Sequence, residues 1–225
     1  MITLRISMIA AAAAMTAMVF AFSANAHQIW LERDGNTARI YFGEPVENVR
    51  EKTGGLLDRI TGARINGPDG NALPETRAED HIAVTLPAGM GDVRMVANSF
   101  PPFGRAPERT RPVMLAREGR SETRAAMDLE LVPVTANGNE FTLMLRGQPL
   151  PRAEVTLVAP PRWERKLRTD AQGRVTFETP WAGRYVAEVI HLENTPGGEG
   201  DGAYARVRTV STLSFTVAQG IAWNN

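Results

Sequence analysis

Apolar and polar residues alternate at every second position over most of the chain after residue 26. This period of two is typical of β-strands, whereas an amphipathic helix repeats every 3.6 residues. Residues 27–43 (HQIWLERDGNTARIYFG) predict two strands joined by a turn at Asp34-Gly35-Asn36. Residues 81–87 (HIAVTLP) and 92–100 (DVRMVANSF) predict another strand pair around the sequence AGMG. The chain therefore predicts an all-β fold.

The alternation is clearest after residue 126, where seven short runs are separated by turn residues such as ANGN and DAQG. The runs are 128–134, 140–147, 153–160, 165–170, 174–180, 184–193 and 209–218. Seven short strands in about a hundred residues are typical of an immunoglobulin-like or transthyretin-like antiparallel sandwich. We expect two such sandwich modules, residues 27–125 and residues 126–225.

Two segments lack this alternation. Residues 44–61 are the only plausible helical stretch, and Gly54-Gly55 interrupts it, so at most a short helix is expected there. Residues 101–125 are rich in Pro and Arg and predict a crossover between the modules. Within this crossover, the sequence PVMLA could add one strand.

The first 26 residues predict a secretory signal peptide. Arg5 is followed by a long run of Ala, Met, Val and Phe, and the segment ends at Ala24-Asn25-Ala26. A charged start, an apolar middle and small residues before the cut are the parts of such a signal. Cleavage after Ala26 would make His27 the first residue of an exported protein without a membrane span. A retained transmembrane anchor is the alternative, although no basic stop-transfer residues follow the apolar run.

Charge and cysteine content narrow the possible functions. The 25 basic residues balance the 25 acidic ones, and no basic stripe indicates binding to nucleic acid or to a membrane surface. The chain contains no cysteine, which excludes disulfides, thiolate metal ligands and cysteine nucleophiles. Any metal bound here must therefore use nitrogen and oxygen ligands.

Longer stretches resemble known families. Residues 147–193 (GQPLPRAEVTLVAP to RYVAEVIHLE) resemble the carboxypeptidase-regulatory-like sandwich domains. The sequence AHQIWLE at the expected mature start and the segment 185–217 (YVAEVIHLENTPGGEGDGAYARVRTVSTLSFTV) together resemble the DUF4198 family of bacterial periplasmic proteins. Members of that family are often labelled as components of nickel or cobalt uptake. The resemblance implies a periplasmic location, two β-rich modules and a role connected with metals.

A mature amino-terminal His27 would offer an α-amine and an imidazole that can chelate one metal ion. The α-amine has a pKa of roughly 7.7–8.0, so a metal can displace its proton near neutral pH. A second imidazole would complete a histidine brace, a nitrogen-rich site that suits Cu(II) and then Ni(II). The alternative is that His27 is incidental, because signal cleavage sites tolerate many residues at this position.

The chain has only two other histidines. His191 ends the run RYVAEVIH before a glycine-rich acidic loop, and it matches the terminal pattern of the resembled family, so it is the favoured partner of His27. Glu193 lies two residues further along the same strand face and could add a carboxylate ligand. His81 follows Glu79-Asp80 and is expected to be an ordinary solvated residue at a strand start.

No nucleophile elbow, phosphate-binding loop or dinucleotide fingerprint is present, so an enzyme is not expected. The sequence predicts a periplasmic binding protein for a divalent transition metal (nickel, cobalt or copper), using His27, His191 and Glu193. It would act as a carrier or accessory component that works with a membrane transporter or an outer-membrane receptor. The alternative is an adhesion or scaffold module that binds a protein or a glycan and no metal.

Overall fold

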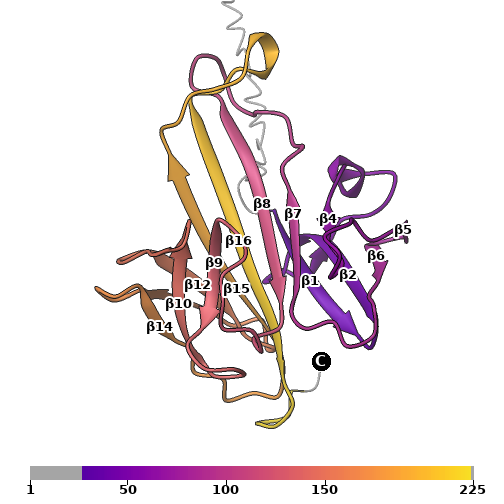
Figure 1. Ribbon diagram of the computed structural model, residues 1–225, viewed down its shortest axis with the longest axis vertical. Coiled ribbons are helices and arrows are strands. Elements are labelled where there is room, and N and C mark those ends of the chain that lie inside the picture. Colours follow the sequence, from indigo (N-terminus) through magenta and orange to yellow (C-terminus); the bar gives the residue numbers. More distant parts are fainter. Residues whose placement is uncertain (1–26, 224–225) are drawn as a thin grey trace, which may run out of the picture.

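The fold is nearly all-β, as the alternating pattern predicted. A computed structural model describes residues 27–223, and the predicted signal peptide lies outside this range. The helical segments of the described chain are two short 3₁₀ turns, η1 (Leu56–Arg59) and η2 (Gly200–Gly202). No helix between residues 27 and 223 is long and apolar enough to cross a membrane. The described strands form three sheets (Figure 1).

The largest sheet, called the central sheet here, has seven strands in the order β13-β12-β15-β16-β8-β7-β4. Their bounds are β4 (Arg64–Ile65), β7 (Val93–Ala97), β8 (Thr110–Glu118), β12 (Glu154–Val158), β13 (Glu164–Arg168), β15 (Gly183–Glu193) and β16 (Arg206–Val217). The long strands β8 and β16 lie side by side and run parallel (Figure 1). Every other strand pair in this sheet is antiparallel among the described residues.

Two smaller sheets complete the described fold. The N-terminal layer has five strands: β1 (Gln28–Asp34), β2 (Thr37–Glu44), β3 (Val49–Arg50), β5 (Glu75–Arg77) and β6 (Ile82–Thr85). The C-terminal layer has four: β9 (Leu129–Pro133), β10 (Glu140–Leu145), β11 (Gln148–Pro149) and β14 (Arg174–Thr176). In Figure 1 they lie on either side of the long strands, the N-terminal layer on the right and the C-terminal layer on the left.

The central sheet carries a hydrophobic core on each face, because successive side chains of a strand point to opposite faces. On β8, Met114 belongs to the core shared with the N-terminal layer, and the next residue, Leu115, belongs to the core shared with the C-terminal layer. On β16, Val210 and Leu213 divide in the same way. The two sandwiches therefore share one sheet, and this sheet takes strands from both sides of the boundary predicted near residue 125.

A buried ion cluster joins the layers at one point. Arg117 of β8 is fully buried and donates hydrogen bonds to Asp92, at 2.5 Å, and to Glu130 of β9, at 2.8 Å. Asp92 lies directly before β7, and Glu130 lies in the C-terminal layer. The buried guanidinium is thus neutralised by carboxylates from two different sheets, as a buried charge requires.

Most of the predicted strands are confirmed, including one from PVMLA, which lies in β8. The short helix after Gly54-Gly55 is also present as η1. The predicted pairing of residues 81–87 with 92–100 is wrong. β6 pairs with β2 and β5 in the N-terminal layer, whereas β7 pairs with β4 and β8 in the central sheet. The AGMG segment is a connection between sheets, because both strands bury their apolar faces in the core between them.

Candidate metal site at His27

His27 lies at one end of the N-terminal layer, directly before β1. The register of the β1–β2 hairpin pairs Gln28 with Gly43, which places His27 beside Glu44 at the end of β2. The chain then turns and returns as β3, and the backbone N–H of Glu51 donates to the carbonyl of Phe42 at 2.8 Å. Hairpin register therefore brings Glu44 and Glu51 to the same end of the sheet as His27.

The imidazole of His27 lies between these two carboxylates. Its Nε2 atom is 2.5 Å from Oε1 of Glu51, and its Nδ1 atom is 3.4 Å from Oε1 of Glu44. The ring also packs against Phe42, with 5.3 Å between the ring centroids. The three polar side chains are between 21% and 28% exposed, so the group is partly shielded and still reachable from solvent.

The hydrogen bond to Glu51 assigns the proton of the ring. An ionised carboxylate only accepts, so Nε2 must carry the hydrogen that it donates to Glu51. In the neutral ring Nδ1 then holds a lone pair, which faces another carboxylate, that of Glu44. Two acceptors that face each other repel, and a cation shared by Nδ1 and Glu44 would remove this repulsion. The separation of 3.4 Å is longer than the N–H···O distance of about 2.7–3.2 Å in ordinary hydrogen bonds.

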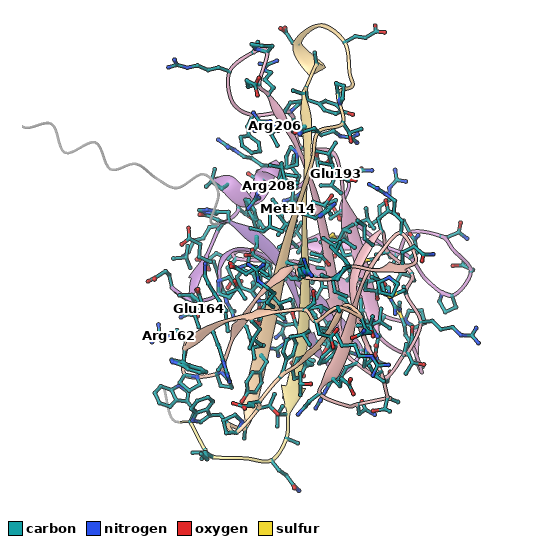
Figure 2. All side chains as sticks on the ribbon, turned by 90° about the vertical axis from the view of Figure 1, so that its left-hand side faces the viewer. Met114, Arg162, Glu164, Glu193, Arg206 and Arg208 are labelled. Atoms are coloured by element: carbon teal, nitrogen blue, oxygen red, sulfur yellow. The ribbon has the colours of Figure 1, made fainter. Side chains whose placement is uncertain are left out.

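A pocket of about 560 Å³ opens beside His27 and Glu44. Its wall is mainly apolar, from Phe100, Pro101 and other residues, and Met114 and Arg208 come from the central sheet. Both are labelled in the upper half of Figure 2. The charge of Arg208 acts on Glu188 of β15: burial raises the pKa of Glu188, and the guanidinium partly opposes this rise. Arg208 in the pocket wall therefore lies within electrostatic reach of a half-buried carboxylate.

His191 and Glu193 lie elsewhere. His191 pairs with Thr209 near the end of β15 and shares a strand face with Val189, which is buried in the core beneath the C-terminal layer. Glu193, on that same face, accepts two hydrogen bonds from the guanidinium of Arg146, at 2.9 and 2.5 Å. These bonds hold the pKa of Glu193 below its usual value. His191 Nε2 is 3.8 Å from Oε1 of Glu193.

The structure does not bring His27 and His191 together. Arg208, which lines the His27 pocket, precedes the β16 residue that pairs with His191, and neighbouring residues on a strand point to opposite faces. The central sheet therefore separates the two imidazoles. His81 is also apart from the His27 group, since its Nδ1 bonds Asp80 at 2.7 Å and its ring lies against Tyr41.

Glu44 and Glu51 were missed by the reasoning from sequence, because residues 44–61 were interpreted as a possible helix. A signal for their proximity was present in EPVENVRE, where Pro45 and Asn48 are typical turn residues between two acidic positions. Among residues 27–223, no group of three or more His, Cys, Asp or Glu side chains is arranged to hold a metal. A metal at His27 would therefore need a ligand that is not a side chain.

A comparison with known protein families finds a match to one part of the chain. Residues 113–193 match the model of DUF4198, which is described as a domain of unknown function. The matched segment runs from within β8 to the end of β15, includes His191 and Glu193, and does not include His27. No curated protein matches the chain.

Proposed function

For this chain, whose residues 113–193 match the DUF4198 family model, we propose a role as a periplasmic binding protein for a divalent transition-metal ion. The ligands are the α-amine and Nδ1 of His27, as the first residue of the processed chain, together with the carboxylate of Glu44. The observation that carries the proposal is the position of Nδ1, which faces Oε1 of Glu44 at 3.4 Å. His191 and Glu193 are not part of this ligand set.

The spacing of the two side-chain atoms suits a shared metal ion. Two metal–ligand bonds of about 2.1 Å hold their ligand atoms about 3.0 Å apart at the right angle of a tetragonal site and about 3.4 Å apart at a tetrahedral angle, so a small movement of Glu44 would suit either geometry. The amine of His27 is the additional ligand, because it and Nδ1 belong to one residue and can close a chelate ring. Cleavage after Ala26 would create this amine, so the site would be complete only in the exported chain.

Glu51 has a different role in this proposal. It accepts the hydrogen of Nε2 and so leaves Nδ1 as the nitrogen with a free lone pair. Metal-binding histidines usually donate their other ring N–H to a carboxylate or a carbonyl, which fixes the ring and makes the ligating nitrogen more basic. Glu51 would orient His27 without touching the metal.

Two nitrogens and one carboxylate oxygen favour copper by the general order of affinity, and nickel and cobalt bind such ligands less tightly. With three protein ligands, positions on the ion would remain for water or for an exchanging partner. The partial exposure of His27 and Glu44 would allow the ion to be handed over. We therefore propose a carrier that delivers its metal to a membrane transporter or takes it from an outer-membrane receptor.

The test is a titration of the processed protein with Cu(II), Ni(II) and Co(II), after intact mass has confirmed that the chain begins at His27. Three changes remove one element each: His27→Ala, Glu44→Gln, and a chain that keeps residues 21–26 ahead of His27. The last variant retains every side chain of the site and lacks only the amine. His191→Ala is the matched control in the same protein.

We expect one equivalent of metal in the processed chain and in His191→Ala, and binding at least tenfold weaker in the three site variants. Equal binding by the chain that keeps residues 21–26 would overturn the role of the amine. The absence of metal binding by the processed chain would overturn the proposal.

A further inference from the structure

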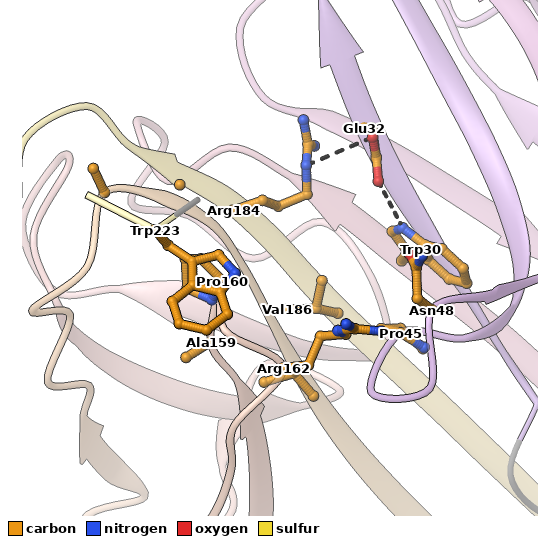
Figure 3. Close-up of a pocket in the computed structure, with 13 residues that line it drawn as sticks. Trp30, Glu32, Pro45, Asn48, Ala159, Pro160, Arg162, Arg184, Val186 and Trp223 are labelled. Carbon is orange, nitrogen blue, oxygen red and sulfur yellow. Dashed lines mark hydrogen bonds and ion pairs between the residues drawn. The ribbon is translucent and has the colours of Figure 1, made fainter. Parts of the chain in front are cut away.

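A second cleft, of about 560 Å³, lies on the face of β1 that carries Trp30 and Glu32, opposite the face that Ile29 and Leu31 bury in the core, and the metal proposal makes no use of it. It opens between the N-terminal layer and the central sheet (Figure 3). Its edges are the turn after β2, with Asn48, the turn after β12, with Arg162, and Trp223 beyond β16. This cleft and the His27 pocket share no lining residue, and Figure 2 labels Arg162 of the cleft well below Met114 and Arg208 of the pocket.

The charged groups of this cleft leave an excess of positive charge. Its acidic residue, Glu32, already has two hydrogen-bond donors and one further ion-pair partner. It accepts from the indole N–H of Trp30 and from Arg50, both at 3.1 Å, and its other oxygen lies 3.6 Å from Nε of Arg184. Figure 3 shows Glu32 between Trp30 and Arg184. Glu32 is the only carboxylate among the described residues that line the cleft, and it already has partners. The cleft would therefore favour an anionic ligand.

Two guanidinium groups have capacity to bind such an anion. The Nη1 atom of Arg184 is buried, and no residue in the range 27–223 accepts a hydrogen bond from it. Arg162 is exposed, and none of the ion pairs among the described residues includes it. Arg162 also has a left-handed backbone with φ of 62°, which is uncommon for a residue with a long side chain. The turn that holds it is closed by its own N–H, which donates to the carbonyl of Ala159 at 2.8 Å.

The remaining wall of the cleft is apolar. Pro160 and Val186 line it, and Trp223 presents an indole that is 45% exposed. Opposite them, Trp30 is fixed by its bond to Glu32 and by stacking on Tyr41, with 5.3 Å between the ring centroids. Cavities of this size suit small organic molecules, and a few charged groups in an apolar wall fix their orientation.

We propose that this cleft binds a small organic carboxylate with a ring-shaped or apolar body. The carboxylate would pair with the guanidinium of Arg162, which matches its geometry and its charge, and Arg184 would add a second positive charge to the same cleft. The body would lie against Trp223 and Pro160. An acidic sugar and an aromatic acid both have this chemistry, and the probes below distinguish them.

The test uses the metal-free protein, titrated by calorimetry and by tryptophan fluorescence. The probes are D-glucuronate and benzoate, each beside a neutral counterpart, D-glucose and benzyl alcohol. We expect one of the two acids to bind with 1:1 stoichiometry, and its neutral counterpart to bind at least tenfold more weakly. Which acid binds identifies the source of the carboxylate.

The decisive variant is Arg162→Asn, because asparagine accepts a left-handed backbone and removes only the cation. We expect a loss of affinity of about tenfold or more, since a charge-assisted bond is removed. Arg168→Asn, an exposed position on β13 outside the cleft, is the matched control and should bind like the wild type. Saturable binding by neither acid, equal binding of the neutral probes, or unchanged affinity in Arg162→Asn would each overturn the proposal.

Discussion

At the level of single residues, the imidazole of His27 has one carboxylate on each of its nitrogens, and the two contacts differ in length. The short one, to Glu51, is a hydrogen bond, and the long one, to Glu44, leaves the distance that a shared metal ion would need. The two glutamates should therefore respond differently to substitution if the proposed function is right.

We expect Glu51→Gln to weaken metal binding by about tenfold and to leave the stoichiometry at one ion. The change removes the charge of the residue that orients His27, but it removes no metal ligand. Glu44→Gln removes a ligand and should cost more. Competition against a chelator of known affinity measures both. Glu193→Gln is the control on the opposite face of the central sheet. A Glu51→Gln protein with the affinity of the wild type would show that Glu51 does not orient the ring.

Asp92 makes a residue-level prediction about pH. Burial raises the pKa of Asp92, but hydrogen bonds from Ser121, Arg117 and the backbone outweigh it and leave the pKa below its usual value. A depressed pKa means that the folded state favours the ionised form. The stabilisation is therefore fully present above the unfolded-state pKa of about 3.9, and it is lost as the pH falls through the lower folded-state value.

Asp92→Asn should reduce the free energy of unfolding by about 3–5 kcal/mol at neutral pH, because the variant leaves the buried charge of Arg117 with one partner fewer. Its stability should also fall less steeply in acid than that of the wild type. Urea denaturation at neutral pH and below about pH 4 measures both effects. A loss at neutral pH below about 1 kcal/mol would mean that Arg117 finds another partner.

At the level of the elements, the hairpin of β2 and β3 positions both glutamates, and Gly43 makes the hairpin possible. Gly43 has φ of 148°, and a Cβ atom there would lie 2.1 Å from the carbonyl oxygen of Val49. Gly43→Ala should therefore push β3 away from β2, at a cost of about 1–3 kcal/mol. Because Glu51 follows β3, metal affinity should fall together with stability. Gly35→Ala also has a positive φ but open space around it, so it is the control that should retain metal binding.

The elements show how much of the fold follows from sequence alone. In β15 the period of two assigned Tyr185, Ala187 and Val189 to one face and Val186 to the other, and the structure confirms this in two different cores. Local alternation determines such faces because each buried position needs an apolar side chain. The assignment of β6 and β7 to different sheets was not predictable, since both strands face the same core and only long-range pairing separates them.

The candidate site was predictable only in part. His27 was identified from the expected cleavage position, because the chemistry of an amino-terminal histidine depends on few other residues. Its neighbours Glu44 and Glu51 depend on hairpin register, which the sequence left open. The faces of β15 were assigned correctly from the sequence. This assignment could not show that the His27 pocket lies on the opposite face of the central sheet from His191, because that depends on the pairing of β15 with β16.

At the level of the whole molecule, the two sandwiches depend on the same central sheet, because each hydrophobic core is formed partly by that sheet. We therefore expect the processed chain to unfold in one cooperative transition, with equal calorimetric and van't Hoff enthalpies. Asp92→Asn should lower the temperature of that transition without splitting it. Two resolved transitions in the wild type would show that the N-terminal and C-terminal layers fold independently.

Strand β16 serves both cores with alternate residues, Val210 toward the N-terminal layer and Leu213 and Phe215 toward the C-terminal layer. A single inserted or deleted residue would exchange these side chains between the two cores along the rest of the strand. Substitutions in β16 can be absorbed one at a time, but a change in its length cannot. Over evolution, the number of residues in this strand should therefore vary less than their identity.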